Sequence, residues 1–405
     1  MLFDFSEEDK QNNSEYRVLA RKYRPQRFAD MIGQDVLVRT IVNAIRSGRI
    51  AHAFVLTGIR GIGKTTTARI IAKALNCTGQ SPESVEPCGK CDNCVAISDD
   101  RHQDVLEMDA ASHTGVNDIR EIIDNVKYRP ISAKYKIFII DEVHMLSNSA
   151  FNALLKTLEE PPAHVKFIFA TTEIRKIPIT ILSRCQRFDL RRIEIEELAN
   201  FYNNVCKKEN FAIEANALKL IASAASGSVR DGLSILDQAM SLTEGGHISE
   251  ATVREMLGLV DSERVFKLFE QIVKGEVAEA TATAKEIYNM GGDPTTLVQD
   301  LMKVVNHTAR YQQLSQDFAE LTEAEMNNVK EFAGKISVQF LSRLWQMLLK
   351  GLEELKMAVQ PFPALEMLII RIAYASTLPS LEEMIKNAPQ NDNKQTSVSE
   401  KKIAN

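Results

Sequence analysis

The stretch AFVLTGIRGIGKTT, residues 53–66, decides the fold of this chain. Its first five residues are an apolar run of strand length, and the next eight match the pattern G-x-x-x-x-G-K-[ST] that opens a helix. The glycines of such a loop let backbone N–H groups point at phosphates, and the helix N-terminus favours negative charge. A glycine-rich turn without a ligand is the alternative, but such a turn has no need of Lys64 and Thr65. The stretch therefore predicts a nucleotide-binding loop, made of Gly58, Ile59, Arg60, Gly61, Ile62, Gly63, Lys64, Thr65 and Thr66.

Apolar runs alternate with helical patterns on both sides of this loop, from residue 16 to about residue 190. The runs are rich in Val, Ile, Leu and Phe, as expected for strands that are covered on both faces. The alternation predicts a parallel α/β sheet. The expected strands are residues 53–57, 105–109, 136–140 and 165–171.

The third of these runs ends abruptly in two carboxylates, Asp141 and Glu142. Taken alone, such a pair is more often a solvated strand end. Together with Lys64 and Thr65 it indicates catalysis of phosphoryl transfer, with Lys64 reaching the terminal phosphates and the Thr65 hydroxyl ligating Mg²⁺. Asp141 would hold Mg²⁺ through water, and Glu142 would orient or deprotonate the water that attacks the γ-phosphate.

Four cysteines lie within eighteen residues, in the spacing C-x10-C-x2-C-x2-C. Four thiolates suit a closed tetrahedral Zn²⁺ site, which would be structural because it leaves no open position. An iron–sulfur cluster or unmetallated thiols are the alternatives, although the C-x3-C-P continuation of a cluster motif is missing. The expected zinc ligands are Cys77, Cys88, Cys91 and Cys94.

The remaining sequence divides the chain further. From about residue 191 the pattern becomes purely helical, and a second helical block follows with Leu341, Leu344, Leu348 and Leu352 at helical spacing. We expect a disordered lead (1–15), an α/β nucleotide-binding domain (16–190) with a cysteine module (77–94), a small helical lid (191–256), an all-helical domain (257–380) and a disordered tail (381–405).

Composition limits the function. The chain has 405 residues, 44% of them hydrophobic, and a formal net charge of −5, which excludes a protein that coats nucleic acid through overall positive charge. No apolar run reaches the roughly 18–20 residues of a membrane span, and residues 1–15 do not resemble a secretory signal. We therefore expect a cytoplasmic protein without membrane partners, whose six cysteines stay reduced.

Several longer strings carry a family resemblance. They are YRVLARKYRP at residues 16–25, GIRGIGKTT, ALNC ahead of the cysteine insert, DEVHMLS, NALLKTLEEPP, FIFATTE and ILSRCQRF. Together they resemble the gamma/tau clamp-loader subunits of bacterial DNA polymerase III, within the AAA+ ATPases, over about residues 16–238. The string PALEMLIIRIA at residues 363–373 resembles the oligomerising collar of that family.

The resemblance implies roles for individual residues. Asp141 and Glu142 correspond to the Walker B pair, and Arg184 in Ser-Arg-Cys to an arginine finger that acts on ATP held by a neighbouring subunit. Without the other motifs, Arg184 would be read as a surface cation. Arg230 resembles the lid sensor of the γ-phosphate, and Thr171 or Thr172 the other sensor. The catalytic candidates are thus Lys64, Asp141, Glu142, Arg184, Arg230 and Thr172.

By the same resemblance the chain is an ATP-driven motor subunit that loads the ring-shaped sliding clamp onto primed DNA within the DNA polymerase III holoenzyme. The implied cofactors are ATP, Mg²⁺ and structural Zn²⁺. The implied partners are other clamp-loader subunits in a hetero-oligomer, expected as a pentamer, the sliding clamp and primer–template DNA. Long family members also hold polymerase and helicase through further domains, whereas this chain ends at Asn405 like a short gamma form or a trimmed long one.

Two other functions remain open at this stage. A non-catalytic clamp-loader scaffold would have a degraded phosphate loop, whereas Lys64, Thr65 and Glu142 are intact here. A branch-migration helicase would share the ATP machinery but is not expected to carry the four-cysteine insert. The basic residues Arg17, Arg21, Lys22, Arg24 and Arg27 fit contacts to nucleotide or DNA as well as they fit a solvated face.

Overall fold

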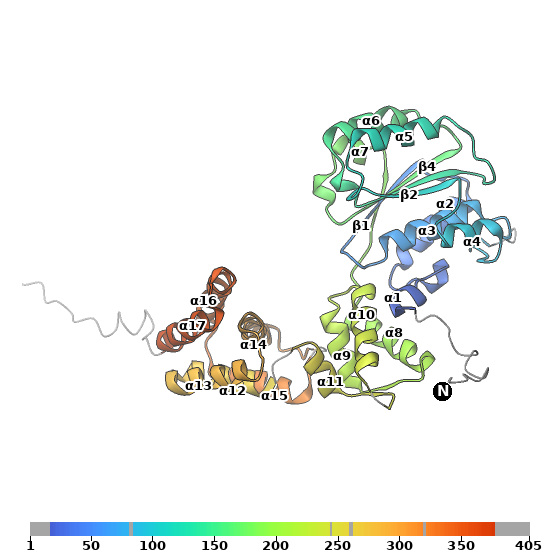
Figure 1. Ribbon diagram of the computed structural model, residues 1–405. Helices are drawn as coiled ribbons and strands as arrows, with labels where there is room; N and C mark the ends of the chain where they lie inside the picture. The colour runs from blue at the N-terminus through green and yellow to red at the C-terminus, as the bar shows by residue number, and fades with distance from the viewer. Residues whose placement is uncertain (1–16, 81–83, 244, 259–261, 319–320, 377–405) are drawn as a thin grey trace, which may run out of the picture. The chain divides into compact units, whose positions relative to one another are not determined.

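The computed structural model describes residues 17–80, 84–243, 245–258, 262–318 and 321–376. The chain forms two compact units, Met1–Met256 and Leu257–Asn405, and each is described by itself (Figure 1). The lead expected at residues 1–15 and the tail expected at 381–405 lie outside the described residues.

The first unit is built on a five-stranded parallel sheet with the order β2-β3-β4-β1-β5. All four strands expected from the sequence are confirmed, and β3 is one residue longer than expected. The expectation of full coverage is wrong for β2, where Leu106 is 38% exposed because β2 forms an edge of the sheet. The short edge strand β5 was not predicted. The strands are β1 (Ala53–Thr57), β2 (Val105–Asp109), β3 (Lys136–Asp141), β4 (Val165–Thr171) and β5 (Gln186–Asp189).

Helices cover both faces of this sheet (Figure 1). On one face lie α2 (Asp35–Arg46), α3 (Lys64–Asn76) and α4 (Asp92–Ser98), and on the other lie α5 (Val116–Val126), α6 (Asn148–Glu159) and the single turn α7 (Ile179–Leu182). Phe138, Phe167 and Phe169 stack in a line beneath α5 and α6 and are almost completely buried. With both faces covered, the ends of the strands are the parts of the sheet open to a ligand.

The end of the first unit is helical, with one exception. Its helices are α8 (Ile195–Lys208), α9 (Ala215–Ala224), α10 (Val229–Leu242) and α11 (Glu250–Met256). The expectation of a purely helical segment is wrong, because the two-residue strands β6 (Ala212–Ile213) and β7 (His247–Ile248) pair in parallel. This pair joins the turn after α8 to the turn before α11.

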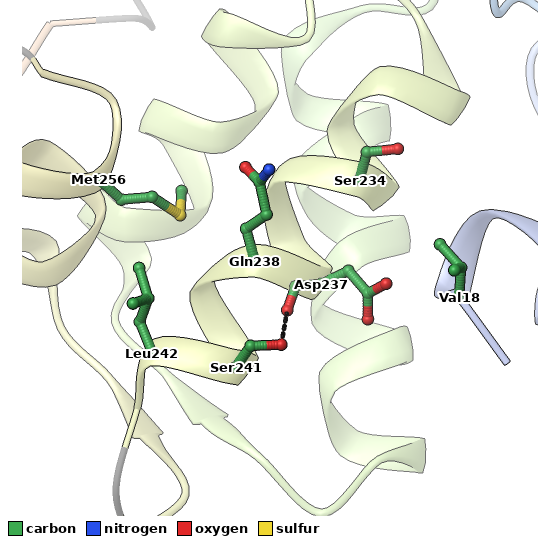
Figure 2. Close-up of a pocket in the computed structure, with 7 residues that line it drawn as sticks. All are labelled: Val18, Ser234, Asp237, Gln238, Ser241, Leu242 and Met256. Carbon is green, nitrogen blue, oxygen red and sulfur yellow. Dashed lines mark hydrogen bonds between the residues drawn. The ribbon is translucent and has the colours of Figure 1, made fainter. Parts of the chain in front are cut away.

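The amino-terminal helix α1 (Leu19–Lys22) packs against α10. The side chain of Leu19 is buried, and its backbone N–H donates a hydrogen bond of 3.3 Å to Oδ2 of Asp237. Beside this contact lies a pocket of about 600 Å³ with Val18 on one side and Leu242 and Met256 on the other (Figure 2). Helix α1 is therefore held on the same helix that carries Arg230.

The second unit contains only helices among its described residues: α12 (Ser262–Lys274), α13 (Val277–Asn289), α14 (Pro294–Leu314), α15 (Glu323–Lys335), α16 (Val338–Met357) and α17 (Pro361–Ser376). The leucine spacing predicted the buried face of α16, where Leu341, Leu344 and Leu348 are at most 2% exposed. At Gly351 a Cβ atom would lie 2.4 Å from Leu368 of α17, so glycine permits the close approach of the two helices. No helix within the described ranges is long and apolar enough to cross a membrane.

Candidate functional site

The phosphate loop connects β1 to α3, and Lys64 is the first residue of α3. The Lys64 side chain is almost fully buried, and Nζ donates hydrogen bonds to the carbonyl oxygens of Gly58 (3.1 Å) and Ile59 (3.0 Å). Burial lowers the pKa of Lys64, whereas the nearby Glu142 and Asp141 carboxylates raise it. The ammonium thus contacts the backbone of the loop, and it does so at the start of a helix whose free N–H groups favour an anion.

Gly61 is the point at which the helical segment after β5 meets the loop. Its φ of +74° lies in the left-handed region, and a Cβ atom there would lie 2.1 Å from Oγ of Ser228. The backbone N–H of Arg230 donates a hydrogen bond of 3.3 Å to the Gly61 carbonyl. Glycine is therefore required at this position on two counts, and Arg230 is held next to the loop.

The end of β3 supplies the carboxylate nearest to the loop. The Thr65 hydroxyl donates a hydrogen bond to Oδ2 of Asp141, and the backbone N–H of Glu142 donates one of 2.9 Å to Oδ1. The two groups that the sequence assigned to Mg²⁺ are thus in direct contact, although they are far apart in the chain. Mg²⁺ is a hard cation that prefers oxygen ligands, and the Thr65 hydroxyl and the Asp141 carboxylate both supply oxygen atoms.

Glu142 is held by the residue that follows β4. Its Oε2 accepts hydrogen bonds from the backbone N–H (3.2 Å) and the hydroxyl (3.1 Å) of Thr172. Nδ1 of His144 lies 3.4 Å from the same oxygen. Glu142 has a φ of 44°, which is uncommon for a residue with a side chain and is found at functional sites more often than elsewhere. The carboxylate is therefore fixed in one orientation.

The two neighbouring threonines have different contacts. The Thr171 hydroxyl lies 3.1 Å from Nδ1 of His144 and accepts a hydrogen bond from the backbone N–H of Glu173, and the residue is fully buried. Thr172 instead contacts Glu142 through both of its donors. Of the two candidates that the sequence left open, Thr172 is the one with a direct contact to a Walker B carboxylate.

Arg184 does not join this group. It follows α7, and its guanidinium lies 2.6 Å from Oε1 of Glu159 at the end of α6 and 2.6 Å from the carbonyl oxygen of Thr180. Two residues later β5 begins with Gln186, which pairs with Phe54 near the start of β1. The phosphate loop leaves β1 at its other end. At about 3.3 Å per residue, the four residues from Phe54 to Gly58 span about 13 Å, so Arg184 lies at the opposite end of the sheet from the loop of its own chain.

The four cysteines form a separate cluster after α3. Their Sγ atoms all lie within 4.8 Å of one another. Cys77 Sγ accepts a hydrogen bond from the backbone N–H of Cys88, and Cys88 Sγ accepts two, from Lys90 and Cys91, at 3.3–3.4 Å. The loop turns at Gly89, whose φ is +70°. The loop backbone therefore stabilises sulfur atoms that carry negative charge.

This cluster fits a tetrahedral metal ion. With Zn–S bonds of about 2.3 Å, tetrahedral geometry puts neighbouring sulfurs about 3.8 Å apart, and the Sγ atoms of Cys77 and Cys91 are 3.9 Å apart. Burial raises the pKa of Cys91, but hydrogen bonds from Cys94 and Thr78 outweigh it and bring that pKa down to about 5. The donors suit a thiophilic ion and leave no position for a substrate.

Two residues beside the phosphate loop and the β3 carboxylates were not singled out from the sequence. His144 lies inside the quoted string DEVHMLS, yet nothing in the string indicated that its ring would reach Glu142 and Glu173. Arg24 was one of five undifferentiated basic residues, but its Nε donates a hydrogen bond of 2.9 Å to the hydroxyl of Thr66. The signal that could have separated Arg24 from the others is the adjacent Pro25, which restricts the backbone at Arg24.

The fold and the site together define a class. The phosphate loop follows β1, which is fourth in the order of the parallel sheet, and two carboxylates follow β3. A helical segment touches the loop. This is the arrangement of an AAA+ nucleotide-binding protein.

Comparison with known proteins identifies the family. Three family models match the chain: DNA polymerase III, delta subunit (residues 33–194), the ATPase lid domain of a DNA polymerase III clamp loader subunit (197–245), and DNA polymerase III subunits gamma and tau domain III (248–388). DNA polymerase III subunit gamma of Buchnera aphidicola is 40% identical, with 89% of this chain and 99% of that protein covered. The chain belongs to the DNA polymerase III gamma/tau family.

The similarity also has limits. DNA polymerase III subunit tau of Salmonella typhimurium is 40% identical over 90% of this chain, but the chain spans only 56% of that protein. Among solved structures, a Thermotoga maritima RuvB Holliday junction branch migration motor is similar with a TM-score of 0.44 and 17% identity, over 62% of this chain and 80% of that one.

Proposed function

We propose that this chain binds and hydrolyses ATP and acts as a motor subunit of the loader that places a sliding clamp on primed DNA. One observation carries the ATPase part: Lys64, the Thr65–Asp141 pair and the Glu142–Thr172 pair come together at the carboxyl ends of β1, β3 and β4. The clamp-loading part rests on membership of the gamma/tau family.

In the proposed reaction the loop surrounds the phosphates with backbone N–H groups. Lys64, which now donates to the loop's own carbonyls, turns to the terminal phosphates. Thr65 and Asp141 would hold Mg²⁺, which would supply positive charge to the phosphates when bound. Glu142 orients the attacking water and accepts its proton, and Thr172 holds the Glu142 carboxylate while sensing whether the γ-phosphate is present.

Two arginines complete the proposed machinery from different places. Arg230 lies against the loop of its own chain and would contact the γ-phosphate from the lid. Arg184 would act in trans, on ATP bound by the adjacent subunit, since it lies at the far end of its own sheet. Its contact with Glu159 must then exchange for a contact with phosphate when subunits assemble.

The four cysteines are proposed to hold one Zn²⁺ with a structural role. The ion would fix the segment between α3 and α4, and it would not touch ATP, because the four thiolates would fill a tetrahedral coordination sphere. The clustered thiols with backbone N–H donors on two of them support this assignment.

The division into parts is also proposed. Residues 16–190 would be the ATPase domain, 191–256 the lid and 257–380 the collar that joins the subunits of a hetero-oligomeric loader. The further partners would be the sliding clamp and primer–template DNA in the cytoplasm.

The ATPase rate of the assembled loader tests this function. We expect clamp and primed DNA to raise the rate when both are present, because family members couple hydrolysis to release of the clamp at a primed junction. A loader that carries Lys64→Ala in this subunit is the control and should not respond. A rate that is measurable but unaffected by clamp and DNA would reject clamp loading and leave the ATPase assignment intact. The non-catalytic scaffold predicts no ATP turnover by this subunit at all.

A further inference from the structure

Arg24 is a half-buried arginine beside the phosphate loop that the proposed mechanism leaves unused. Its Nε donates to the hydroxyl of Thr66, in the first turn of α3. Within the described residues no carboxylate forms an ion pair with Arg24 or with Arg230. Arginines that are buried this far normally have an anionic partner.

The nearest carboxylates are already engaged. Arg69, one turn further along α3, forms a two-point contact with Glu107 (2.6 and 2.8 Å) and lies 3.3 Å from Asp100. Burial lowers the pKa of Arg24, Arg69 and Arg230 lower it further, and Glu107 and Asp141 only partly oppose them. Arg24 and Arg230 therefore add positive charge beside the loop that Glu107 and Asp100 do not pair, and such charge favours binding of an anion.

The position of Arg24 is fixed from both sides. On the lid side Nζ of Lys22 lies 2.8 Å from Glu209, the residue that follows α8, and the Tyr23 hydroxyl donates to the same carboxylate. On the other side the Arg24 side chain reaches α3. The segment thus spans from the lid helices to the phosphate loop, and an arginine that served only as a solvated cation would need no such anchoring.

We propose that Arg24 binds the α-phosphate of the nucleotide. The inference rests on the proposed function, that the loop binds ATP. Lys64 reaches the β- and γ-phosphates and Thr65 faces Mg²⁺. The α-phosphate is then left to the next residue of the helix, Thr66, and to Arg24, which donates to its hydroxyl. Since ATP and ADP share the α-phosphate, Arg24 stabilises both complexes equally and adds nothing specific to the transition state.

Titration of the full chain with fluorescent ADP and with fluorescent ATP tests this assignment. Arg24→Ala is expected to weaken both nucleotides by the same factor, about tenfold, which corresponds to about 1.4 kcal/mol. kcat at saturating ATP should stay near that of the unsubstituted chain. Arg24→Lys should recover part of the affinity, because it keeps the charge and loses the planar fork. Arg21→Ala, an exposed arginine of the same segment, is the matched control and should change neither affinity.

A purely structural role gives a different result. Arg24→Gln keeps an N–H donor for Thr66 but removes the charge, so we expect an unchanged Tm and weakened binding of both nucleotides. A lower Tm with unchanged affinities would overturn the proposal, and so would a loss confined to ATP, which would indicate the γ-phosphate instead. If the unsubstituted chain binds neither nucleotide, the proposed ATPase function itself fails.

Discussion

The two ends of the central sheet differ in how many groups of the proposed ATP site they bring together within one chain. At the carboxyl ends of β1, β3 and β4, Lys64, Asp141 and Glu142 meet within one chain and form hydrogen bonds to neighbours of that chain. At the amino end of β5, Arg184 contacts Glu159 and the carbonyl oxygen of Thr180 and lies far from the phosphate loop of its own chain. One end carries the proposed nucleotide site, and the other carries a cation that a nucleotide bound at that site would not reach.

This difference follows from parallel strands. All strands of a parallel sheet run in one direction, so residues before a strand and residues after a strand lie at opposite ends. Arg184 precedes β5, whereas Gly58 follows β1. Folding of one chain cannot bring them together, and a second subunit can. In the proposed reaction, ATP is therefore bound within one chain, and catalysis is completed across an interface between chains.

Arg184→Ala should have the largest effect. In the assembled loader, kcat should fall by about 10³–10⁵, as for arginine fingers generally, while ATP affinity stays nearly unchanged because the guanidinium acts on charge that develops in the transition state. Steady-state kinetics and nucleotide titration measure the two quantities. Arg187→Ala, an exposed arginine of β5 paired with Asp189, is the control. Equal losses for both substitutions would make Arg184 an ordinary surface cation.

Glu142→Gln tests the other end of the sheet. The amide keeps the shape and the Thr172 contacts but cannot accept the proton of the attacking water. Single-turnover hydrolysis should slow by about 10²–10⁴, and ATP should remain bound. Near-normal hydrolysis would move the catalytic base to another residue.

Lys64→Ala should act on binding. Loss of the buried ammonium removes charge-assisted hydrogen bonds to the terminal phosphates, and we expect ATP affinity to fall by about 100-fold or more. A fluorescent nucleotide titration measures it. Unchanged affinity would mean that residues 58–65 form only a turn, and the contrast between the two ends of the sheet would then have no basis.

Local patterns in the sequence predicted the parts of this site that a continuous stretch defines. The phosphate loop, the carboxylates after β3 and the cysteine spacing were all readable, because each depends on neighbours in the chain. The contact between Thr172 and Glu142, the anchoring of Arg24 on α3 and the pairing of Arg184 with Glu159 join distant segments. Such contacts depend on strand order and on side-chain orientation, which one sequence does not encode in any local pattern.

Cys91→Ser should have the smallest effect on ATP binding and hydrolysis, since the cysteine cluster lies apart from both ends of the sheet. Elemental analysis should find about one zinc per chain in the unsubstituted protein, and less in the variant. The free energy of unfolding should fall by about 3 kcal/mol, because part of the metal-binding energy is folding energy. Lys90→Ala, exposed within the same loop, is the control. Iron in place of zinc, or no metal in protein purified without chelator, would reject the zinc assignment.

A mixture of two inactive variants tests most directly whether the proposed ATP site is shared between chains. Lys64→Ala cannot bind ATP but keeps Arg184, and Arg184→Ala binds ATP but lacks the arginine. If Arg184 acts in trans, mixed assemblies contain interfaces that join an intact phosphate loop to an intact Arg184, and ATPase activity should reappear in the mixture. If gel filtration shows that the two variants co-assemble while the mixture stays as inactive as either variant alone, Arg184 does not act across the interface.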